Sequence, residues 1–543
     1  MSEVFWSVDS LVVRDNAIFG FGWAFHVKNE ITAIQLRLTF AGPAKSLPEY
    51  ISADVGKPRE DVERAFLNQP NALNSGYVVF GAFPAEMQLN SIDLMCSLAD
   101  GSVVELAVPT SNVIQFSSEN EAENSRLMLR QFYVFFRRGV HLVRAGKFTS
   151  LFEKVRRYLI GRPKSALHKP ADLAAVLRDS ERKDLCLILD HDLGGGANHY
   201  RDRLVDSIIN DGRSVVILTY HVATLSHMLI VRNLRINLRF SIADRTLLLN
   251  AVKNLSVTDI IYNTAVSFVR PEEIPQLLIS IKRATSARLK VLVHDFFLVC
   301  PSHFLINDAA QHCHIPDMSV CVNCLQRNQQ GFTSLFLDRD MPKWRSIWGS
   351  LLAVADEIVT FSDNSSKLLL KAYPQIQGAK ISVVPHKVNH LTGKLPRITN
   401  TNCLCIGVIG QIGFHKGAVF VQALALEVKR RGLDLKIIVI GAIEARCEPS
   451  VLSQTGPYKH VDLPDLIEKT GVNVFLFPSI WPETFSYVVH ELVDMDLPVA
   501  SFNLGAPAER LASYPKGLVL DSMDPGCVLD DLISFHRKIY LVY

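Results

Sequence analysis

Short apolar segments alternate with helix-like segments from about residue 184 to the end of the chain. The apolar segments are rich in branched residues and lack inside–outside alternation; the first series comprises LCLILD, SVVILTY, TDIIYN, LKVLVHDF, ADEIVTFS and KISVVP. Strands of this kind are buried on both faces, as they are when helices cover both sides of a parallel sheet. The pattern therefore predicts an α/β fold.

A second series of such segments comprises CLCIGVIG, LKIIVIGA, VNVFLFPS, LPVASFN and GLVLD. The polar stretch HKVNHLTGKLPRITNTN separates the two series, which places a linker near 386–402. We predict two Rossmann-like domains, at 181–390 and 391–543. Ligands of such sheets bind beyond the carboxyl ends of the strands.

The first 180 residues have a different pattern. In residues 1–117, runs such as SLVVRDNAIFGFGWAF, AIQLRLTF and SGYVVFGAF alternate with turns, which predicts an accessory β-sandwich module. Residues 118–180 are predicted to form a basic helical linker, with eleven Lys and Arg and one acid between Arg126 and Lys164. The linker can lie on an anionic membrane or pack on the protein with its charges in water, and we slightly favour the second arrangement.

The composition excludes several classes of protein. The net charge of +3 gives no global nucleic-acid footprint. The N-terminal residues MSEVFWSVDS do not read as a secretory signal, and no uncharged apolar run of about 18 residues is present. Ten cysteines in 543 residues argue against a disulfide scaffold. We expect a cytoplasmic protein, with peripheral contact at the inner face of a membrane left open.

Two candidate site segments follow predicted strands of the first series. In DHDLGGGANHY, Gly194, Gly195 and Gly196 open a helix, so that a backbone without Cβ atoms can approach an anionic ligand. A tight strand–helix turn explains the same residues equally well. In VLVHDFFLVCP, His294 and Asp295 stand where a strand ends and where a side chain can reach a substrate, although a lone His is often structural.

Two further candidates follow strands of the second series. In GVIGQIGFHKG, Lys416 stands at a helix start beside Gly413 and suits a diphosphate, unless it is simply a solvated lysine. In PSIWPETFSYVVHELVDMDLPVAS, Glu483 and Glu491 are eight positions apart across a predicted helix start. That spacing lets both carboxylates face one cleft, where they can meet sugar and ribose hydroxyls.

The span 184–522 resembles the retaining glycosyltransferases of family 4, which have a GT-B fold. The resemblance rests on the order of the Gly-rich loop, HDFF, ADEIVTFSD, ISVVPH, GFHKG, the two glutamates and DLPVASFNLGAPAE. It implies a nucleotide-sugar donor, a hexose-type sugar and a glycan or lipid-linked acceptor, in surface polysaccharide synthesis. The chain departs from the family at Gln411, where an arginine is common, and at Asp496, where a glycine is common.

The resemblance also implies a role for each candidate. Gly195 and Gly196 would lie near the donor phosphates or the acceptor, and His294 would contact the transferred sugar. Lys416 beside Gly413 would bind the diphosphate. The remaining implied donor contacts are sugar hydroxyls at Glu483, the amides of Thr484, Phe485 and Ser486, and the ribose at Glu491. The N-terminal module resembles β-sandwich segments attached to bacterial polysaccharide glycosyltransferases, through GFGWAF, KPREDV and NSGY.

Four cysteines, Cys300, Cys313, Cys321 and Cys324, lie within 25 residues and end in a Cys-x2-Cys pair. Four thiolates could hold a structural zinc that pins the loop 300–324, but the spacing is irregular for a zinc ribbon and reduced thiols remain an alternative. Catalysis itself would require no cofactor.

Other functions remain open at this stage. A catalytically degenerate GT-B protein could bind glycans as a scaffold, and Gln411 mildly favours that alternative, whereas Lys416, Glu483 and Glu491 argue against it. An isomerase or a phosphorylase on the same fold is a third possibility, although no phosphate or cofactor site for a phosphorylase is visible. The sequence identifies neither the sugar nor the acceptor.

Overall fold

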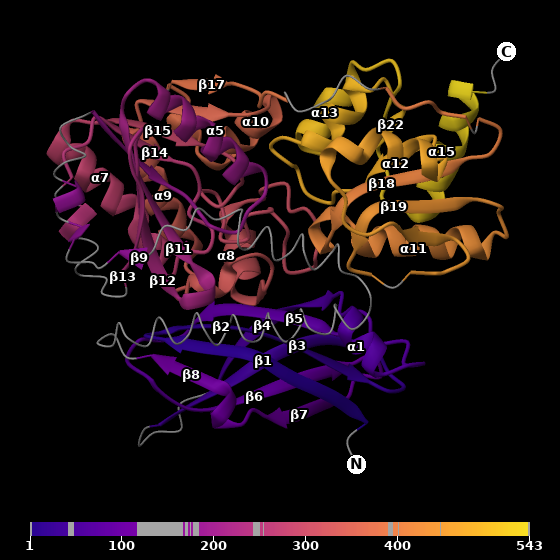
Figure 1. Cartoon of the computed structure of the whole chain (residues 1–543), viewed down its shortest axis with the longest axis horizontal. Coiled ribbons are helices and arrows are strands. Elements are labelled where there is room, and N and C mark those ends of the chain that lie inside the picture. The colour runs from indigo at the N-terminus through magenta and orange to yellow at the C-terminus, as the bar shows by residue number, and fades with distance from the viewer. Residues whose placement is uncertain are drawn as a thin grey trace. The chain divides into compact units, whose positions relative to one another are not determined.

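The computed structural model is a mixed α/β structure that divides into two compact units (Figure 1). Unit 1 comprises Met1–Val291 and Phe332–Asp356, and unit 2 comprises Leu292–Gly331 and Glu357–Tyr543. The structure describes residues 3–41, 48–116, 167–168, 172–173, 175–177, 184–242, 250–252, 255–378, 380–388, 395–399, 401–445 and 447–540. The domain boundaries drawn from the sequence stay a prediction.

Nearly all of the predicted basic linker, 118–180, lies outside the described residues. Within the described part of the chain, no helix is both long enough and apolar enough to cross a membrane. Peripheral membrane contact through 126–164 therefore stays a prediction.

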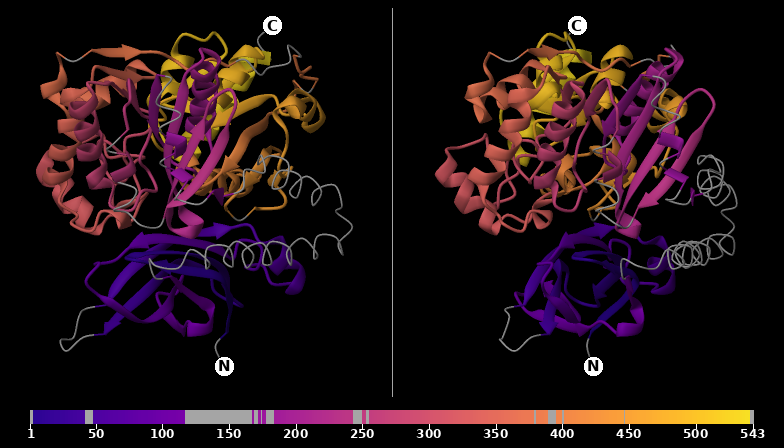
Figure 2. Two further views of the ribbon diagram at one scale, coloured as in Figure 1. Left: turned by 60° about the vertical axis from the view of Figure 1, so that its left-hand side comes forward. Right: turned by 90° about the vertical axis from the view of Figure 1, so that its left-hand side faces the viewer.

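The N-terminal part of unit 1 consists of eight strands and one short helix, α1 (Glu60–Ala65). The strands are β1 (Val4–Arg14), β2 (Ala17–His26), β3 (Ile31–Ala41), β4 (Glu49–Lys57), β5 (Gly76–Ala82), β6 (Gln88–Leu98), β7 (Val103–Ala107) and β8 (Val113–Phe116). They form one hydrogen-bonded sheet in the order β7-β6-β3-β4-β5-β2-β1-β8. One apolar cluster draws on strands from both ends of this order, including Leu11, Leu36 and Leu106, so the sheet curls around a common core (Figure 2). The β-rich prediction agrees with this structure, whereas a sandwich of two separate sheets is not confirmed.

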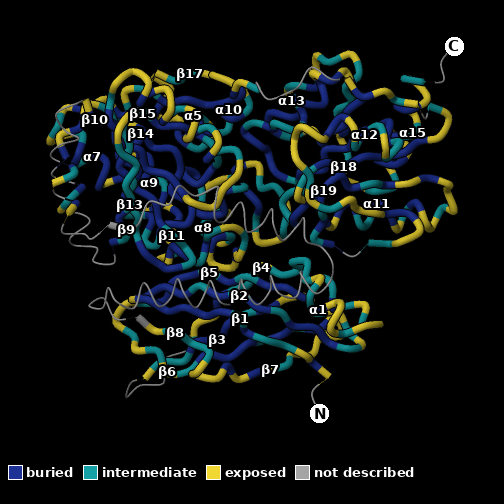
Figure 3. The backbone as a smooth tube through the Cα atoms, in the orientation of Figure 1, coloured by how far each residue is buried: buried dark blue, intermediate teal, exposed yellow. Residues whose placement is uncertain are grey.

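The α/β part of unit 1 contains a seven-strand run in the order β15-β14-β10-β11-β12-β13-β9. Its strands are β9 (Leu167–His168), β10 (Leu185–Leu189), β11 (Ser214–His221), β12 (Ser226–Arg232), β13 (Asn237–Ile242), β14 (Asp259–Tyr262) and β15 (Arg288–Leu292). Its named α-helices are α5 (Gly196–Asn210), α7 (Ile274–Thr285) and α9 (Met341–Val354). The central strands β10, β11, β14 and β15 are parallel, as the sequence predicts, and their residues are largely buried (Figure 3).

The structure differs from the predicted parallel sheet at β12 and β13. These two strands form an antiparallel hairpin, and β12 also pairs antiparallel with β11. The turn between them is stabilised by Asn233, whose side-chain oxygen accepts hydrogen bonds from the backbone of Arg235 and Ile236. An Asn that bonds its own backbone in this way is a turn signal that the sequence interpretation did not use.

Unit 2 begins with the loop after β15 and the helix α8 (Met318–Arg327). It continues with the strand β16 (Glu357–Thr360), the helix α10 (Asp363–Ala372) and the strand β17 (Ile381–Val383), and the two strands pair in parallel. The Ser362 hydroxyl accepts a hydrogen bond from the backbone N–H of Ser365 and so caps the start of α10.

The rest of unit 2 is built on a six-stranded, wholly parallel sheet. Its strands are β18 (Cys405–Ile412), β19 (Lys436–Ile443), β20 (Leu452–Gln454), β21 (Val474–Phe477), β22 (Val499–Phe502) and β23 (Gly517–Leu520). Their order is β20-β19-β18-β21-β22-β23, so the first strand in sequence has the second and the fourth as neighbours. This is the doubly wound order of nucleotide-binding Rossmann folds, whose ligand crevice lies where the chain reverses its direction across the sheet. Here that point falls between β18 and β21.

Helices cover both faces of this sheet (Figure 1). They are α11 (Ala418–Arg430), α12 (Leu463–Thr470), α13 (Tyr487–Asp494), α14 (Gly505–Ala512) and α15 (Pro525–Tyr540). One buried cluster joins α11 and α15 to Ile406 and Val408, and the other joins α12 and α13 to Cys405 and Ile409. Since neighbouring residues of a strand point to opposite faces, these two clusters are the two helix layers.

Candidate functional site

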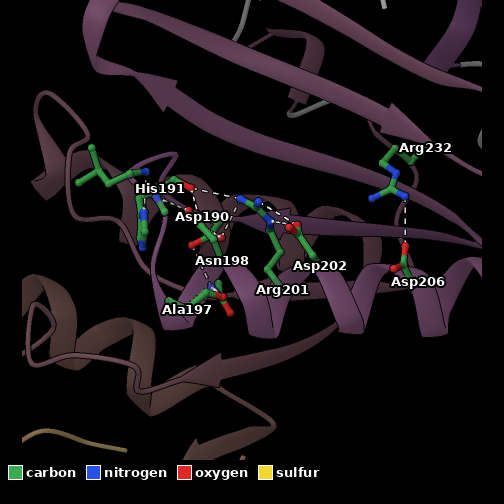
Figure 4. Close-up of polar contacts among 11 residues, drawn as sticks. Asp190, His191, Ala197, Asn198, Arg201, Asp202, Asp206 and Arg232 are labelled. Carbon is green, nitrogen blue, oxygen red and sulfur yellow. Dashed lines mark hydrogen bonds and ion pairs between the residues drawn. The ribbon is translucent and has the colours of Figure 1, made fainter. Parts of the chain in front are cut away.

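The Gly-rich loop of unit 1 follows β10 and is supported by a buried polar network (Figure 4). The Asp190 side chain is fully buried. Its carboxylate accepts hydrogen bonds from Asn198 at 2.8 Å, Arg201 at 3.0 Å and Asn263 at 2.9 Å. The Asn198 side-chain oxygen in turn accepts from the backbone N–H of Gly194 at 2.7 Å. The loop is therefore tied to β10, β14 and α5 through one carboxylate.

The loop conformation requires glycine. Gly194 and Gly195 both have φ of +85°, and a Cβ built at either residue would have no neighbour within 4 Å. Backbone strain, not lack of space, therefore excludes larger residues there. The open surroundings leave the backbone approachable by a ligand, as the sequence predicts for this loop.

Two titratable groups at the base of the loop have shifted pKa values. Burial raises the pKa of Asp190 to about 6, against the lowering effects of Arg201 and the amide hydrogen bonds. Burial and the Arg201 charge lower the pKa of His191 to about 4, so this imidazole is neutral at pH 7. Its Nδ1 accepts a hydrogen bond from the backbone N–H of Leu193. His191 therefore supports the loop directly, and Asp190 supports it through Asn198.

In unit 2, the turn Gly413–Gly417 follows β18 at the reversal point of the sheet. The backbone N–H of Lys416 donates to the Gly413 carbonyl oxygen, and the His415 carbonyl oxygen accepts from Ile480, so the turn is joined to the loop after β21. A Cβ on Gly413 would lie 2.9 Å from Oε2 of Glu444, which places a carboxylate beside the turn. Lys416 is half-buried at the start of α11.

Glu483 lies in the loop after β21 and is buried. The Ser479 hydroxyl donates to its Oε1 at 3.1 Å. Burial raises the pKa of Glu483, while the charge of Lys416 and the Ser479 hydrogen bond lower it. Lys416 and Glu483 therefore interact electrostatically at the carboxyl edge of this sheet.

The backbone of Glu483 is fixed by the start of α14. Its carbonyl oxygen accepts from the N–H of Ala506 at 2.8 Å. Gly505 has φ of +62°, and a Cβ there would lie 2.6 Å from the Glu483 carbonyl oxygen and 2.5 Å from the Pro482 carbonyl carbon. Only glycine satisfies both the positive φ and this close approach. Gly505 is thus a positioning residue for Glu483.

The segment Thr484–Ser486 leads into α13. The Ser486 hydroxyl accepts from the N–H of Val489 and caps the helix. Among the described residues, none accepts a hydrogen bond from the backbone N–H groups of Thr484, Phe485 or Ser486. Free N–H groups at a helix start attract anions and polar oxygens.

Glu491 lies in the second turn of α13, and its side chain is only 1% exposed. Nδ1 of His460 lies 3.4 Å from Oε1 of Glu491, and the His460 side chain is 61% exposed. The hydrogen bond to Glu491 raises the pKa of His460. The Glu491 charge also acts on Tyr458, whose pKa is raised mainly by burial.

His294 follows β15 at the start of unit 2. Its carbonyl oxygen accepts from the Thr484 hydroxyl at 2.8 Å, which brings it next to the Glu483 loop. Its ring stacks on Phe361 with ring centroids 4.4 Å apart. The neighbouring Asp295 accepts from the backbone N–H of Phe297. The unit therefore brings His294, Lys416, Glu483 and Thr484 together.

A second histidine, His386, stands beside this group. It lies in the segment after β17, and its Nδ1 is 2.8 Å from the Tyr487 hydroxyl. Its ring stacks on Phe485 at 4.6 Å and meets Phe361 edge-on at 4.2 Å. His386 thus links the first α/β segment of unit 2 to the start of α13.

Comparison with known proteins finds similarity to solved structures, at low sequence identity. No family model matches the chain, and no curated protein matches it. Among solved structures it is similar to the sucrose-phosphate synthase of Thermosynechococcus elongatus, with 13% identity, a TM-score of 0.45, and coverage of 66% of this chain and 92% of that one. It is also similar to a glycosyltransferase from Rickettsia africae, with 15% identity, a TM-score of 0.42, and coverage of 66% and 92%. Anabaena HepE in complex with UDP and glucose gives 14% identity, a TM-score of 0.39, and coverage of 64% and 89%. Values of this size fix neither the family nor the activity.

The predicted zinc site is not seen as a cluster. Among the described residues, no three His, Cys, Asp or Glu side chains are arranged to hold a metal ion. Burial raises the pKa of the Cys313 and Cys324 thiols, and Asn328 donates to the Cys324 sulfur. Zinc at Cys300, Cys313, Cys321 and Cys324 stays a prediction. Metal analysis of protein purified without added metal decides it, since freely titratable thiols without stoichiometric zinc would reject the idea.

Several residues of the site have no counterpart in the sequence interpretation. Gly505 fixes Glu483, His460 covers Glu491, and Asn198 with Arg201 supports the Gly-rich loop. A glycine at the first position of α14 is a sequence signal for a close backbone approach. His460 offered none, because it is brought to Glu491 by the path of the loop before α12 and not by any spacing along the chain.

Proposed function

We propose that this protein is a retaining glycosyltransferase that moves a hexose-type sugar from a nucleoside-diphosphate sugar to a glycan or lipid-linked acceptor. Supporting this proposal most strongly is the electrostatic interaction of Lys416 with the buried Glu483 at the reversal point of a doubly wound sheet. The cation at that point suits the diphosphate of the donor, and the buried carboxylate suits its sugar. The diphosphate is strongly anionic, and the sugar carries hydroxyl donors.

Lys416 has the role of stabilising the diphosphate as it leaves. Charge that develops on a leaving group is stabilised best by preorganised cations and N–H donors. The N–H groups of Thr484–Ser486 are such donors, because no described residue accepts from them. With Gln411 neutral and the Glu444 carboxylate beside Gly413, Lys416 carries most of this task.

The two glutamates bind hydroxyl groups in this proposal. A carboxylate touching the diphosphate would be repelled by it, so Glu483 meets sugar hydroxyls and Glu491 meets the ribose. The backbone of His294 is bonded to Thr484, which puts this histidine beside the sugar end. Holding donor and acceptor together in this way lowers the barrier through orientation.

The finer parts of the proposal rest on the resemblance of the motif order alone. These are the retaining course, the hexose, the part in surface polysaccharide synthesis and the cytoplasmic location. The Gly194–Gly196 loop has open surroundings suited to a donor phosphate or acceptor. The proposal requires no cofactor for catalysis.

The test is a screen of nucleotide sugars for slow donor hydrolysis, for transfer to lipid-linked and soluble glycan acceptors, and for thermal stabilisation of the protein. A donor that stabilises the protein and is hydrolysed or transferred supports the proposal. Stabilisation by glycans without any turnover of a nucleotide sugar would favour the glycan-binding scaffold instead.

A further inference from the structure

Glu491 cannot be reached by a ligand in the structure as it stands. Its side chain is 1% exposed, although the proposed function has it binding ribose hydroxyls. A hydroxyl group needs to come within about 3 Å of a carboxylate oxygen to donate a hydrogen bond. Something that covers Glu491 has to move before a nucleotide can be bound there.

His460 contacts the Glu491 carboxylate from outside its helix. Its Nδ1 lies 3.4 Å from Oε1 of Glu491, while 61% of its side chain is exposed to solvent. It belongs to the short 3-10 turn His460–Asp462 that precedes α12, so it comes from outside the helix that carries Glu491. A side chain that is mostly in water can rotate away at little cost, whereas the buried Glu491 is held by the body of α13.

We propose that His460 occupies the ribose subsite of the empty protein and that the vicinal hydroxyls of a nucleoside diphosphate displace it from Glu491. This inference rests on the proposed function and adds a competitor within the same site. The imidazolium and the ribose both donate hydrogen bonds to the same carboxylate. Binding of the nucleotide therefore returns His460 to water.

The competition depends on pH. The Glu491 hydrogen bond raises the pKa of His460, so the covered state holds its proton more tightly than the displaced state. Between its ordinary pKa and the raised pKa, His460 is protonated in the covered state and neutral once displaced, so nucleotide binding has to release a proton. The neutral imidazole above that pKa is a weaker competitor. Nucleotide affinity is thus expected to rise as pH rises through the raised pKa.

The other titratable groups around His460 do not reverse this sign. Tyr458 precedes it in the chain, Lys459 and Asp462 flank it, and Asp465 lies in the first turn of α12. None of these four groups is among the causes of the His460 pKa shift, which are Glu491 and burial.

The experiment measures equilibrium affinity for nucleoside diphosphates from pH 6 to 8. The probes are UDP, GDP and ADP, together with the 2′-deoxy form of whichever binds. The proteins are the wild type, His460→Gln, and Lys469→Gln, which removes an exposed cation from the end of α12. Titration of the phosphate itself is common to all three proteins and cancels in the comparison.

We expect His460→Gln to bind the ribonucleotide about two- to fivefold more tightly than the wild type at pH 6 and equally at pH 8, the range set by a partly exposed ion pair. The 2′-deoxynucleotide should show less of this difference, and Lys469→Gln should follow the wild type. NMR titration of the His460 ring should show its pKa fall in Glu491→Gln.

Two outcomes would overturn the inference in distinguishable ways. If a nucleotide binds but His460→Gln has the same pH profile as the wild type, the competition is wrong and the proposed function stands. If no nucleotide binds to any of the proteins at any pH, the proposed function fails and the inference fails with it.

Discussion

The protein has two glycine-containing loops at the carboxyl ends of parallel strands. The buried carboxylate at each loop accepts a different number of hydrogen bonds from the protein. In unit 1, Asp190 accepts from three side-chain donors, all from neighbouring strands and helices. In unit 2, Glu483 accepts from one serine hydroxyl and lies near the cation Lys416.

That difference separates a supporting carboxylate from one available to a ligand. A buried charge whose oxygens are filled by protein donors has no capacity left for a substrate, and its removal takes away the acceptor that those donors share. A buried carboxylate with few protein donors retains lone pairs for hydroxyl groups. On this basis, substitutions in the first loop should change stability, and those in the second should change activity.

The largest expected effect is on stability, from Asp190→Ala. Removing this carboxylate leaves Arg201 and two amides without their shared acceptor, which should lower the free energy of unfolding by about 3–5 kcal/mol. Denaturant unfolding of the wild type and the variant measures the change. The control is Asp206→Ala on α5, the helix that carries Arg201. The ion pair of Asp206 with Arg232 is exposed, and its loss should cost at most about 1 kcal/mol (Figure 4). Equal losses for both variants would mean that the network around Asp190 is not the support.

Next in size is the effect of Lys416→Ala on transfer. Loss of the cation that stabilises the leaving diphosphate should lower kcat roughly 10²-fold or more, while the unfolding midpoint stays near that of the wild type. Steady-state transfer assays and denaturation measure the two quantities. Lys416→Arg should recover part of the rate because it keeps the charge. If Lys416→Ala lowers stability and leaves kcat unchanged, the two loops do not differ in the way proposed.

A smaller effect is expected from Gly505→Ala. The added Cβ would meet the Glu483 backbone at 2.6–2.7 Å, at a φ of +62° that alanine disfavours. The strain should cost about 1–3 kcal/mol in stability and displace Glu483. Kinetics should then show a lower kcat with little change in affinity for the free nucleotide. The control is Gly432→Ala, whose φ is +63° but which has no neighbour within 4 Å of a Cβ. If both variants have equal activity, Gly505 does not position Glu483.

The sequence predicts the outline of this arrangement better than its detail. Branched, unalternated segments predict the parallel strands β10, β11, β14, β18, β19 and β21 to β23, because strands buried on both faces consist largely of apolar residues. The short strand β20 was not predicted. The hairpin β12–β13 was missed because its alternating residues were not distinguished from a helical segment. The N-terminal module was predicted as a β-sandwich, whereas its eight strands form one curled sheet, because the pairing between distant strands is not visible in the sequence pattern.

Site residues divide in the same way. Lys416 and Glu483 follow strands, and Glu491 lies in the second turn of the next helix, so all three could be proposed from their positions in the sequence. The partners of those residues could not, because His460 meets Glu491, and Arg201 meets Asp190, only after the chain has folded. The pKa shifts of Glu483 and Asp190 depend on such partners and on burial, neither of which a motif encodes.

The most direct test of the central claim is equilibrium binding of the nucleotide sugar selected by the screen, measured by calorimetry with the wild type, Lys416→Ala and Asp206→Ala. We expect one specific donor to bind the wild type and Asp206→Ala equally, and Lys416→Ala at least tenfold more weakly, because the diphosphate loses its cation. Equal affinity of all three proteins for the donor would contradict the placement of the nucleotide at the carboxyl edge of the unit 2 sheet.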